Sequence, residues 1–262
     1  MAYRRGSNII AFSPGFLPFT ALFHLVLFAV RLFDWLVLGL RVKGRTHLRG
    51  VESAVLVSNH TLLLDPAVIA HAVRPKRTYF TMLEETAGIP CLGTFVRLLG
   101  GVPIPETSAA MRTLEAAARR AAQTVGLMHF FPEGECYRWS QELHPFQSGA
   151  FYLACRMDLP VLPLTTVLHE RRWPACLPLR LGSRELRLPL RITVVIGEPV
   201  FPRQFSTSRA GMTARSRRQA AEAMTRYTRR VIQATIDRER GCKTLYRGPM
   251  PRLVRPGTGP AC

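Results

Sequence analysis

A histidine and a carboxylate stand five positions apart at the end of a predicted strand. His60 and Asp65 follow the apolar run 54–57, which is short, continuous and rich in β-branched residues. Such a run predicts a strand buried on both faces, and ligands collect at the carboxyl ends of such strands. A neutral imidazole takes the proton of a hydroxyl group when a carboxylate holds its other nitrogen. If the chain turns sharply between them, the two residues form a general base for a hydroxyl substrate.

The pair also has a purely structural interpretation. Asp65 before Pro66 is typical of a helix start, with an acidic N-cap ahead of proline at the first helical position. A histidine and an aspartate at this spacing also occur often by chance. A second strand end favours the catalytic interpretation, because Glu133 and Gly134 follow the predicted strand 127–131. Two polar strand ends in one sheet usually face one pocket.

The remaining pattern predicts the elements that position these residues. Short apolar segments alternate with helical stretches, which indicates an α/β fold with a central mixed, mostly parallel sheet flanked by helices. The predicted strands cover residues 54–57, 77–81, 102–104, 127–131, 161–167 and 190–196. The predicted helices cover residues 66–73, 92–99, 107–125, 149–157 and 213–240. Residues 174–189 predict an irregular excursion or a hairpin.

An uncharged apolar segment opens the chain. Residues 8–30 carry no formal charge and an apolar run resumes over 35–40, which is enough for a membrane helix of about 20 residues. A spanning helix, an anchor that enters one leaflet and a cleavable secretory signal all remain open. The signal is least favoured, because no small-residue cleavage site follows and the basic flank 41–45 favours the cytoplasmic side. Because Pro14 and Pro18 disfavour one regular helix, an anchor that enters one leaflet has equal weight with a spanning helix.

Basic residues dominate the carboxyl-terminal part. The net charge is +19, and residues 203–255 hold thirteen arginines and one lysine against three acidic residues. Such a surface attracts phosphates of lipids or nucleic acids, or is simply a solvated helix face. We favour an anionic membrane surface and expect no nucleic acid. The predicted division is a membrane anchor over 1–45, a catalytic core over 46–205 and a basic helix and tail over 206–262, located at the cytoplasmic face of the cell membrane.

The cysteines predict neither metal binding nor nucleophilic catalysis. Six cysteines form no CxxC pair and no zinc-like spacing with histidine. Cys136 has no histidine beside it in the sequence and is interpreted as a small residue of the pocket wall. His129, inside the predicted strand 127–131, is interpreted as a buried structural histidine.

Four segments stand in a distinctive order between residues 59 and 164. They are NHTLLLD at 59–65, LGGVPI at 99–104, FPEG at 131–134 and LPVLPL at 159–164. In this order they resemble the glycerolipid acyltransferases typified by 1-acylglycerol-3-phosphate acyltransferase. The resemblance implies transfer of a fatty acyl chain from acyl-CoA or acyl carrier protein to a lysolipid hydroxyl, by direct attack without an acyl-enzyme and without a bound cofactor.

The resemblance also implies roles for individual residues. His60 is the base, Asp65 orients it, and Glu133 and Gly134 shape the acceptor pocket together with Asn59 and Gly101. The amino-terminal hydrophobic helices hold the site at the bilayer, and the segment 159–164 supports the pocket.

Three departures concern the cations expected to hold the acceptor phosphate. Glu106 replaces an arginine, Glu135 opens a Glu-Cys-Tyr segment in place of Thr-Arg-Ser, and Leu83 replaces a lysine. A carboxylate in place of a cation reverses the interaction with phosphate. We therefore expect a neutral, zwitterionic or cationic headgroup near Glu106 and Glu135.

Three alternatives stay open. One is a true 1-acylglycerol-3-phosphate acyltransferase in which Arg97 or Arg138 supplies the phosphate contacts. Another is an acyltransferase of the lyso-ornithine-lipid type. The third, from a different class, is a non-catalytic protein that binds anionic lipid or nucleic acid through its arginines.

Overall fold

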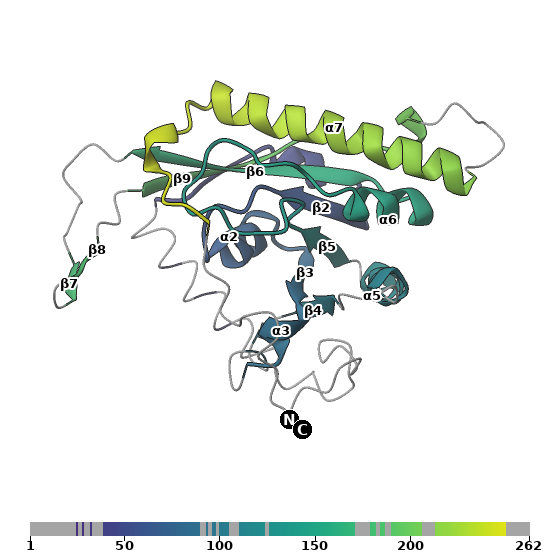
Figure 1. The fold of residues 1–262 in the computed structure, drawn as a ribbon, viewed down its shortest axis with the longest axis horizontal. Coiled ribbons are helices and arrows are strands. Elements are labelled where there is room, and N and C mark those ends of the chain that lie inside the picture. The colour runs from purple at the N-terminus through teal and green to yellow at the C-terminus, as the bar shows by residue number, and fades with distance from the viewer. Residues whose placement is uncertain are drawn as a thin grey trace.

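The computed structural model describes residues 39–89, 100–104, 110–123, 126–170, 184–186, 190–205 and 213–249, with the separate positions 25, 28, 32, 93, 96, 97 and 179–181. These residues form a central sheet covered by helices (Figure 1). The predicted amino-terminal anchor falls almost entirely outside the described residues. Among the residues described, none of the helices has the length and apolar content needed to cross a membrane.

The sheet has seven strands in the order β1-β9-β6-β2-β5-β3-β4. The strands are β1 (Arg41–Lys43), β2 (Ala54–Ser58), β3 (Arg77–Leu83), β4 (Gly101–Ile104), β5 (Gly126–Phe130), β6 (Val161–Glu170) and β9 (Leu190–Ile196). All neighbours pair in parallel except β6 and β9, which are antiparallel. The predicted mixed, mostly parallel α/β sheet is confirmed.

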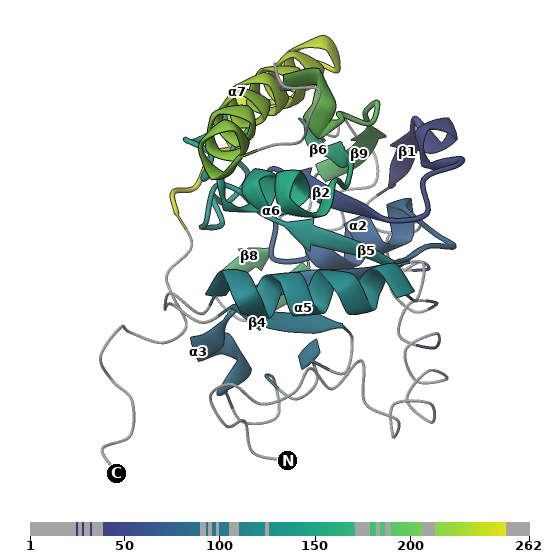
Figure 2. The same cartoon turned by 90° about the vertical axis from the view of Figure 1, so that its right-hand side faces the viewer.

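Helices cover both faces of this sheet. They are α2 (Asp65–Ala72), α3 (Glu84–Ala87), α5 (Ala110–Gln123), α6 (Gly149–Met157) and α7 (Ala214–Arg238), with short 3-10 turns at Arg45–Leu48, Pro202–Phe205 and Lys243–Leu245. Figure 1 shows α2 on one side of β3 and β5 and α5 on the other. A quarter turn brings α5 and α6 to the front, with α7 above them (Figure 2).

The central strand β2 is buried on both faces, as its β-branched run predicts. Val55 and Val57 belong to the core beneath α5, α6 and α7, whereas Leu56 belongs to the core beneath α2. All three side chains have no exposed surface. Because a strand alternates its side chains between two faces, a continuous apolar run can supply both cores at once.

The basic carboxyl-terminal helix packs on the core. Thr213 caps α7, its hydroxyl oxygen accepting a hydrogen bond from the Ser216 amide at 3.1 Å. Met224, Ile232 and Ile236 on one face of α7 are buried against the sheet and α6. Most arginines of α7 are exposed, because their placement around the helix leaves one apolar stripe free for packing. Arg229 is half-buried, and it donates to the carbonyls of Leu143 and His144 at 2.6 and 3.1 Å.

Some elements differ from those that the sequence predicts. Residues Arg41–Lys43 were assigned to the anchor, but they form β1, an edge strand paired with β9. A charged three-residue segment has no strand signal of its own, so pairing decides its structure. The short helix α3 was not predicted. Of the two predictions for residues 174–189, the hairpin agrees with the structure, because Leu179–Leu181 pairs antiparallel with Arg184–Leu186.

Truncating Phe151 in α6 tests the core beneath α7. Phe151 is fully buried, so Phe151→Ala leaves a cavity and should lower the free energy of unfolding by about 3–5 kcal/mol. Urea denaturation measures this loss. Arg226→Ala, on the exposed face of α7, is the control and should change stability by no more than about 0.5 kcal/mol. Equal effects of the two substitutions would contradict this packing.

Candidate active site

The buried carboxylate of Asp65 organises the loop that follows β2. Asp65 has no exposed surface, and its Oδ2 lies 2.9 Å from His60 Nδ1. The same oxygen accepts hydrogen bonds from the backbone amides of Thr61 at 2.7 Å and Leu62 at 2.8 Å. Three donors converge on this one oxygen, and the loop folds tightly around it. The sharp turn that the His60–Asp65 pair requires is therefore present.

The structure corrects the predicted capping role of Asp65. Leu64 is the N-cap of α2, and Asp65 is its first residue. The carboxylate binds amides that precede the helix rather than those inside it. Asp-Pro is a common helix start, but here burial against the loop directs the side chain backward, toward His60.

His60 is held through its backbone as well as its ring. Its amide donates to Glu133 Oε1 at 3.0 Å, and its carbonyl accepts from the Tyr137 amide at 2.9 Å. The imidazole stacks on Phe131, with ring centroids 3.8 Å apart. Its side chain keeps 19% exposure, and Nε2 has no hydrogen-bond partner within the described part of the chain. With Nδ1 bound to the carboxylate, Nε2 is the nitrogen available to take a proton.

Glu133 ties the two loops together. Its carboxylate is buried, and its second oxygen accepts from the His144 amide at 3.0 Å. Burial raises the pKa of Glu133 to about 7, although the amides of His60 and His144 act in the opposite direction. Because both oxygens bind backbone amides, Glu133 sets the position of His60. The acceptor role that the resemblance implies for it stays a prediction.

Asn59 and Gly134 shape the backbone around this pair. The side-chain amide of Asn59 makes two hydrogen bonds of 2.9 Å with the backbone of Thr166 in β6, which fixes the start of the His60–Asp65 loop. Gly134 has a φ of 76°, and a Cβ there would lie 2.7 Å from Gln147 Nε2. A side chain at position 134 would therefore strain the turn that carries Glu133.

The other predicted pocket residues are more dispersed. Gly101 is buried at the start of β4, level with Phe80 of β3 and His129 of β5, and β5 and β3 separate it from β2 and the loop of His60. Glu135 is half-buried in the loop of Glu133, and Glu106 lies outside the described residues. Leu83 is exposed at the carboxyl end of β3. Arg97 is buried, whereas Arg138 is exposed and donates from Nη2 to the Arg247 carbonyl at 2.9 Å.

His129 lies beneath the catalytic ring. It is fully buried, as predicted, with Nε2 2.9 Å from Ser58 Oγ and its ring edge-on to Phe131 at 4.4 Å. Burial, and then the charge of His60, lower the pKa of His129 well below its usual value. A neutral imidazole without access to solvent is a structural residue rather than a second base.

Cys136 is not activated as a nucleophile. Burial, reinforced by the carboxylates of Asp65 and Glu133, raises the pKa of its thiol to about 12. Since the thiolate is the reactive form, this cysteine is inert at neutral pH. The prediction that it is a small residue next to the site agrees with this environment.

The sequence analysis missed the contribution of the carboxyl-terminal segment. Arg247 and Gly248 exchange backbone hydrogen bonds with Arg138, at 2.9 and 3.1 Å, and the Arg247 guanidinium lies over the Trp139 ring. This segment therefore braces the loop that binds His60. It had been predicted as part of a Gly/Pro-rich tail, and no local pattern predicts a pairing that joins residues about a hundred positions apart.

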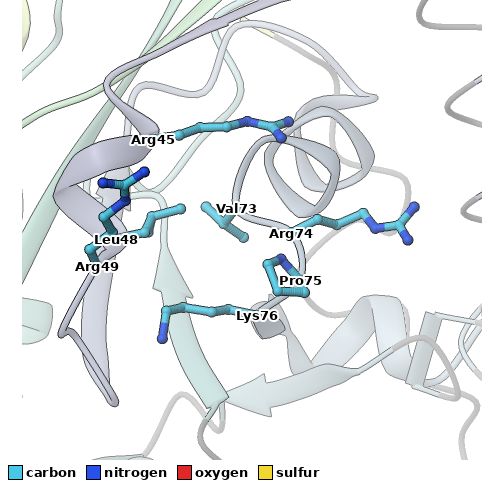
Figure 3. Close-up of a pocket in the computed structure, with 7 residues that line it drawn as sticks. All are labelled: Arg45, Leu48, Arg49, Val73, Arg74, Pro75 and Lys76. Atoms are coloured by element: carbon cyan, nitrogen blue, oxygen red, sulfur yellow. The ribbon is translucent and has the colours of Figure 1, made fainter.

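A separate cavity of about 220 Å³ lies at the amino ends of the parallel strands. Leu48, Val73 and Pro75 line its centre, and the charged ends of Arg45, Arg74 and other basic side chains point outward from them (Figure 3). Its polar groups do not converge, and it holds neither His60 nor Glu133. The His60–Asp65 pair lies at the opposite end of the strands, where β2 ends.

Comparison with known proteins finds acyltransferases. The family model described as Acyltransferase matches residues 39–167, a range that includes the loop of His60 and that of Glu133. Over about half of its length the chain is similar to proteins named as acyltransferases. An uncharacterized acyltransferase of Schizosaccharomyces pombe is 31% identical over 127 residues, covering 47% of this chain and 45% of the relative. A 1-acyl-sn-glycerol-3-phosphate acyltransferase of Haemophilus influenzae is 28% identical over 130 residues, covering 48% and 53%.

The fold also matches a solved structure of the family. The crystal structure of the 1-acyl-sn-glycerophosphate (LPA) acyltransferase of Thermotoga maritima superposes with a TM-score of 0.56 at 21% identity, covering 83% of this chain and 81% of that one. This likeness concerns the fold. The chain spans about half the length of the curated relatives it matches.

The buried glutamate predicts a specific pH dependence of stability. Because its pKa rises from 4.5 to about 7 on folding, Glu133 contributes stability that is complete below pH 4.5 and is lost as the pH passes 7. Relative to Glu133→Gln, the wild type should lose about 2–3 kcal/mol of unfolding free energy over this interval. Denaturation at a series of pH values measures the difference. A difference that does not change with pH would refute the assignment.

Proposed function

We propose that this protein is a membrane-associated O-acyltransferase that moves a fatty acyl chain from a thioester to the hydroxyl of a lysolipid. The observation that carries the proposal is the His60–Asp65 pair, with the imidazole held by a buried carboxylate at 2.9 Å and its other nitrogen open to a substrate. The match to the Acyltransferase family model supports the same reaction class.

The chemistry follows from the available nitrogen. His60 Nε2 accepts the proton of the acceptor hydroxyl while that oxygen attacks the carbonyl carbon of the thioester. Asp65 stabilises the imidazolium that forms and prevents the ring from turning. The tetrahedral intermediate then collapses, the carbon–sulfur bond breaks, and the imidazolium returns its proton to the leaving thiolate. The ester and a free thiol are the products.

The proposed reaction uses acyl-CoA or acyl carrier protein as co-substrate and involves no acyl-enzyme. The buried Cys136 thiol, with its raised pKa, is unsuited to carry the acyl group. The lysolipid and its membrane are the proposed partners, at the cytoplasmic face of the cell membrane.

The proposed acceptor does not depend on the usual phosphate-binding cations. Leu83, where the family has a lysine, is apolar and exposed at the carboxyl end of β3. Glu135 places a carboxylate in the loop of Glu133. These residues favour a neutral, zwitterionic or cationic headgroup, as in a lyso-ornithine lipid.

A lysophosphatidate acceptor is the second candidate, and Arg138 favours it. This arginine is exposed beside Tyr137, whose amide binds the His60 carbonyl. In this candidate its guanidinium, which donates to the Arg247 carbonyl at 2.9 Å, supplies the lost phosphate contact. Arg97, the other candidate from the sequence, is buried.

Thiol release from long-chain acyl-CoA and from acyl carrier protein, across a panel of lysolipids, tests the reaction. His60→Ala should reduce turnover by about 100-fold or more, because the general base is lost. Asp65→Asn should reduce it strongly as well, since Nδ1–H loses its anionic acceptor.

Two substitutions are matched controls for this assay. His47, a half-buried histidine at the other edge of the sheet, and Cys136 should both tolerate alanine without loss of turnover. Absence of thiol release with every acceptor and both donors, together with salt-sensitive binding of nucleic acid, would instead support the non-catalytic alternative.

A charge reversal tests the acceptor. Glu106→Arg, with Glu106→Gln as the neutral control, should shift preference toward acceptors that carry a phosphate monoester, because a carboxylate that repels phosphate becomes a cation that binds it. The ratio of kcat/KM for lysophosphatidate to that for a zwitterionic lysolipid reports the shift. An unchanged ratio would count against a headgroup role for Glu106.

A further inference from the structure

Two leucines between the catalytic residues are exposed to solvent. Leu63 exposes 66% and Leu64 46% of its surface, although Thr61 and Asp65 on either side are buried. The reason is local, because the Asp65 carboxylate binds the amides of Thr61 and Leu62 and turns the loop around itself. The side chains of Leu63 and Leu64, which follow Leu62, are therefore directed outward. Single exposed apolar residues are normal, whereas apolar residues that gather into one patch mark an interaction site.

Aromatic, basic and apolar residues lie around this loop. The Tyr137 amide binds the His60 carbonyl, and the next residue, Arg138, pairs with Arg247 through backbone hydrogen bonds. The ring of His144 stacks on Tyr137 and lies 6.3 Å from that of Tyr246. Leu83 is exposed at the same edge of the sheet. We call the exposed set the leucine–arginine surface: Leu63, Leu64, Leu83, Arg138, Tyr246 and Arg247.

This composition fits the interface of an anionic bilayer. Leucine side chains enter the acyl region, tyrosine prefers the level of the headgroups, and arginines bind lipid phosphates. A second apolar stripe points to the same partner, since Leu25, Phe28 and Leu32 are exposed at helical spacing in the amino-terminal segment. A lysolipid in such a membrane presents its hydroxyl at headgroup depth, next to an inserted loop.

We propose that the loop between His60 and Asp65 inserts into the membrane, with Leu63 and Leu64 entering the acyl region of an anionic bilayer. The arginines of the leucine–arginine surface bind the headgroups around it. Insertion brings Nε2 of His60 to the depth of the acceptor hydroxyl, a consequence that rests on the proposed acyltransferase function. The membrane contact itself does not depend on turnover.

Fluorescence quenching locates the loop directly. Leu63→Trp in the full chain, with vesicles of brominated phosphatidylcholine and phosphatidylglycerol in equal parts, should add emission that the acyl-chain bromines quench. The signal of the parent chain, with its three tryptophans, is subtracted. Phe201→Trp is the matched control, because Phe201 is 47% exposed but lies near the start of β6, at the opposite edge. Added emission from Leu63→Trp that stays unquenched on bound vesicles would overturn the proposal.

A charge in the loop tests the consequence for catalysis. In Leu63→Asp/Leu64→Asp, turnover on a vesicle-embedded lysolipid should fall about tenfold or more relative to turnover on a short-chain monomeric analogue. Phe201→Asp should leave this ratio unchanged. An equal loss on both substrates would overturn membrane insertion in favour of a purely structural loop.

The same experiments separate this inference from the proposed function. Quenching of Leu63→Trp without any thiol release would retain the membrane surface and reject the acyltransferase. Turnover on vesicles without quenching of Leu63→Trp would retain the acyltransferase and reject the membrane contact of the loop. If acyl carrier protein changed the emission added by Leu63→Trp and the brominated vesicles did not quench it, the surface would bind a protein and the proposal would be overturned.

Discussion

One buried oxygen, Oδ2 of Asp65, is the contact on which the site depends. It receives the His60 ring and two backbone amides. A carboxylate removed from water is costly, and the donors on Oδ2 offset that cost, while Oδ1 is buried without a hydrogen-bond partner among the described residues. Wrapping the loop around Oδ2 turns the chain between residues 60 and 65, engages Nδ1 of His60 and directs Leu63 and Leu64 outward. The geometry of the His60–Asp65 pair and the exposed apolar tip thus share one cause.

The second loop makes this arrangement rigid. Glu133 binds the amides of His60 and His144, Tyr137 binds the His60 carbonyl, and Phe131 supports the ring. These contacts reach His60 from one loop at the end of the neighbouring strand, β5. The sheet order places β2 beside β5, so two turns that are seventy residues apart in the chain meet at one edge. The high pKa of Glu133 reflects the burial that this bracing requires.

Charge and apolarity have separate positions in the fold. Most arginines of α7 are exposed while its apolar stripe covers the sheet, but Arg229 is half-buried and donates to the carbonyls of Leu143 and His144. The basic cavity at the amino ends of the strands has charged groups that diverge. At the carboxyl ends of the strands, Arg138 lies between Tyr137 and Trp139, whose amides bind the carbonyls of His60 and Thr61.

The sequence by itself determined the main helices and strands and the proximity of His60 to Asp65. Periodicity is local, so the runs that became β2, β5, β6 and α6 were predictable within a few residues. His60 and Asp65 are close in the chain, and one turn brings them together. Only the tertiary structure decided that Asp65 binds the loop rather than capping α2, that Asn59 and Glu133 serve as braces, and that Arg41–Lys43 and residues 246–249 join distant partners. These contacts depend on which strands become neighbours, and that choice is made by burial of the whole sheet rather than by any local pattern.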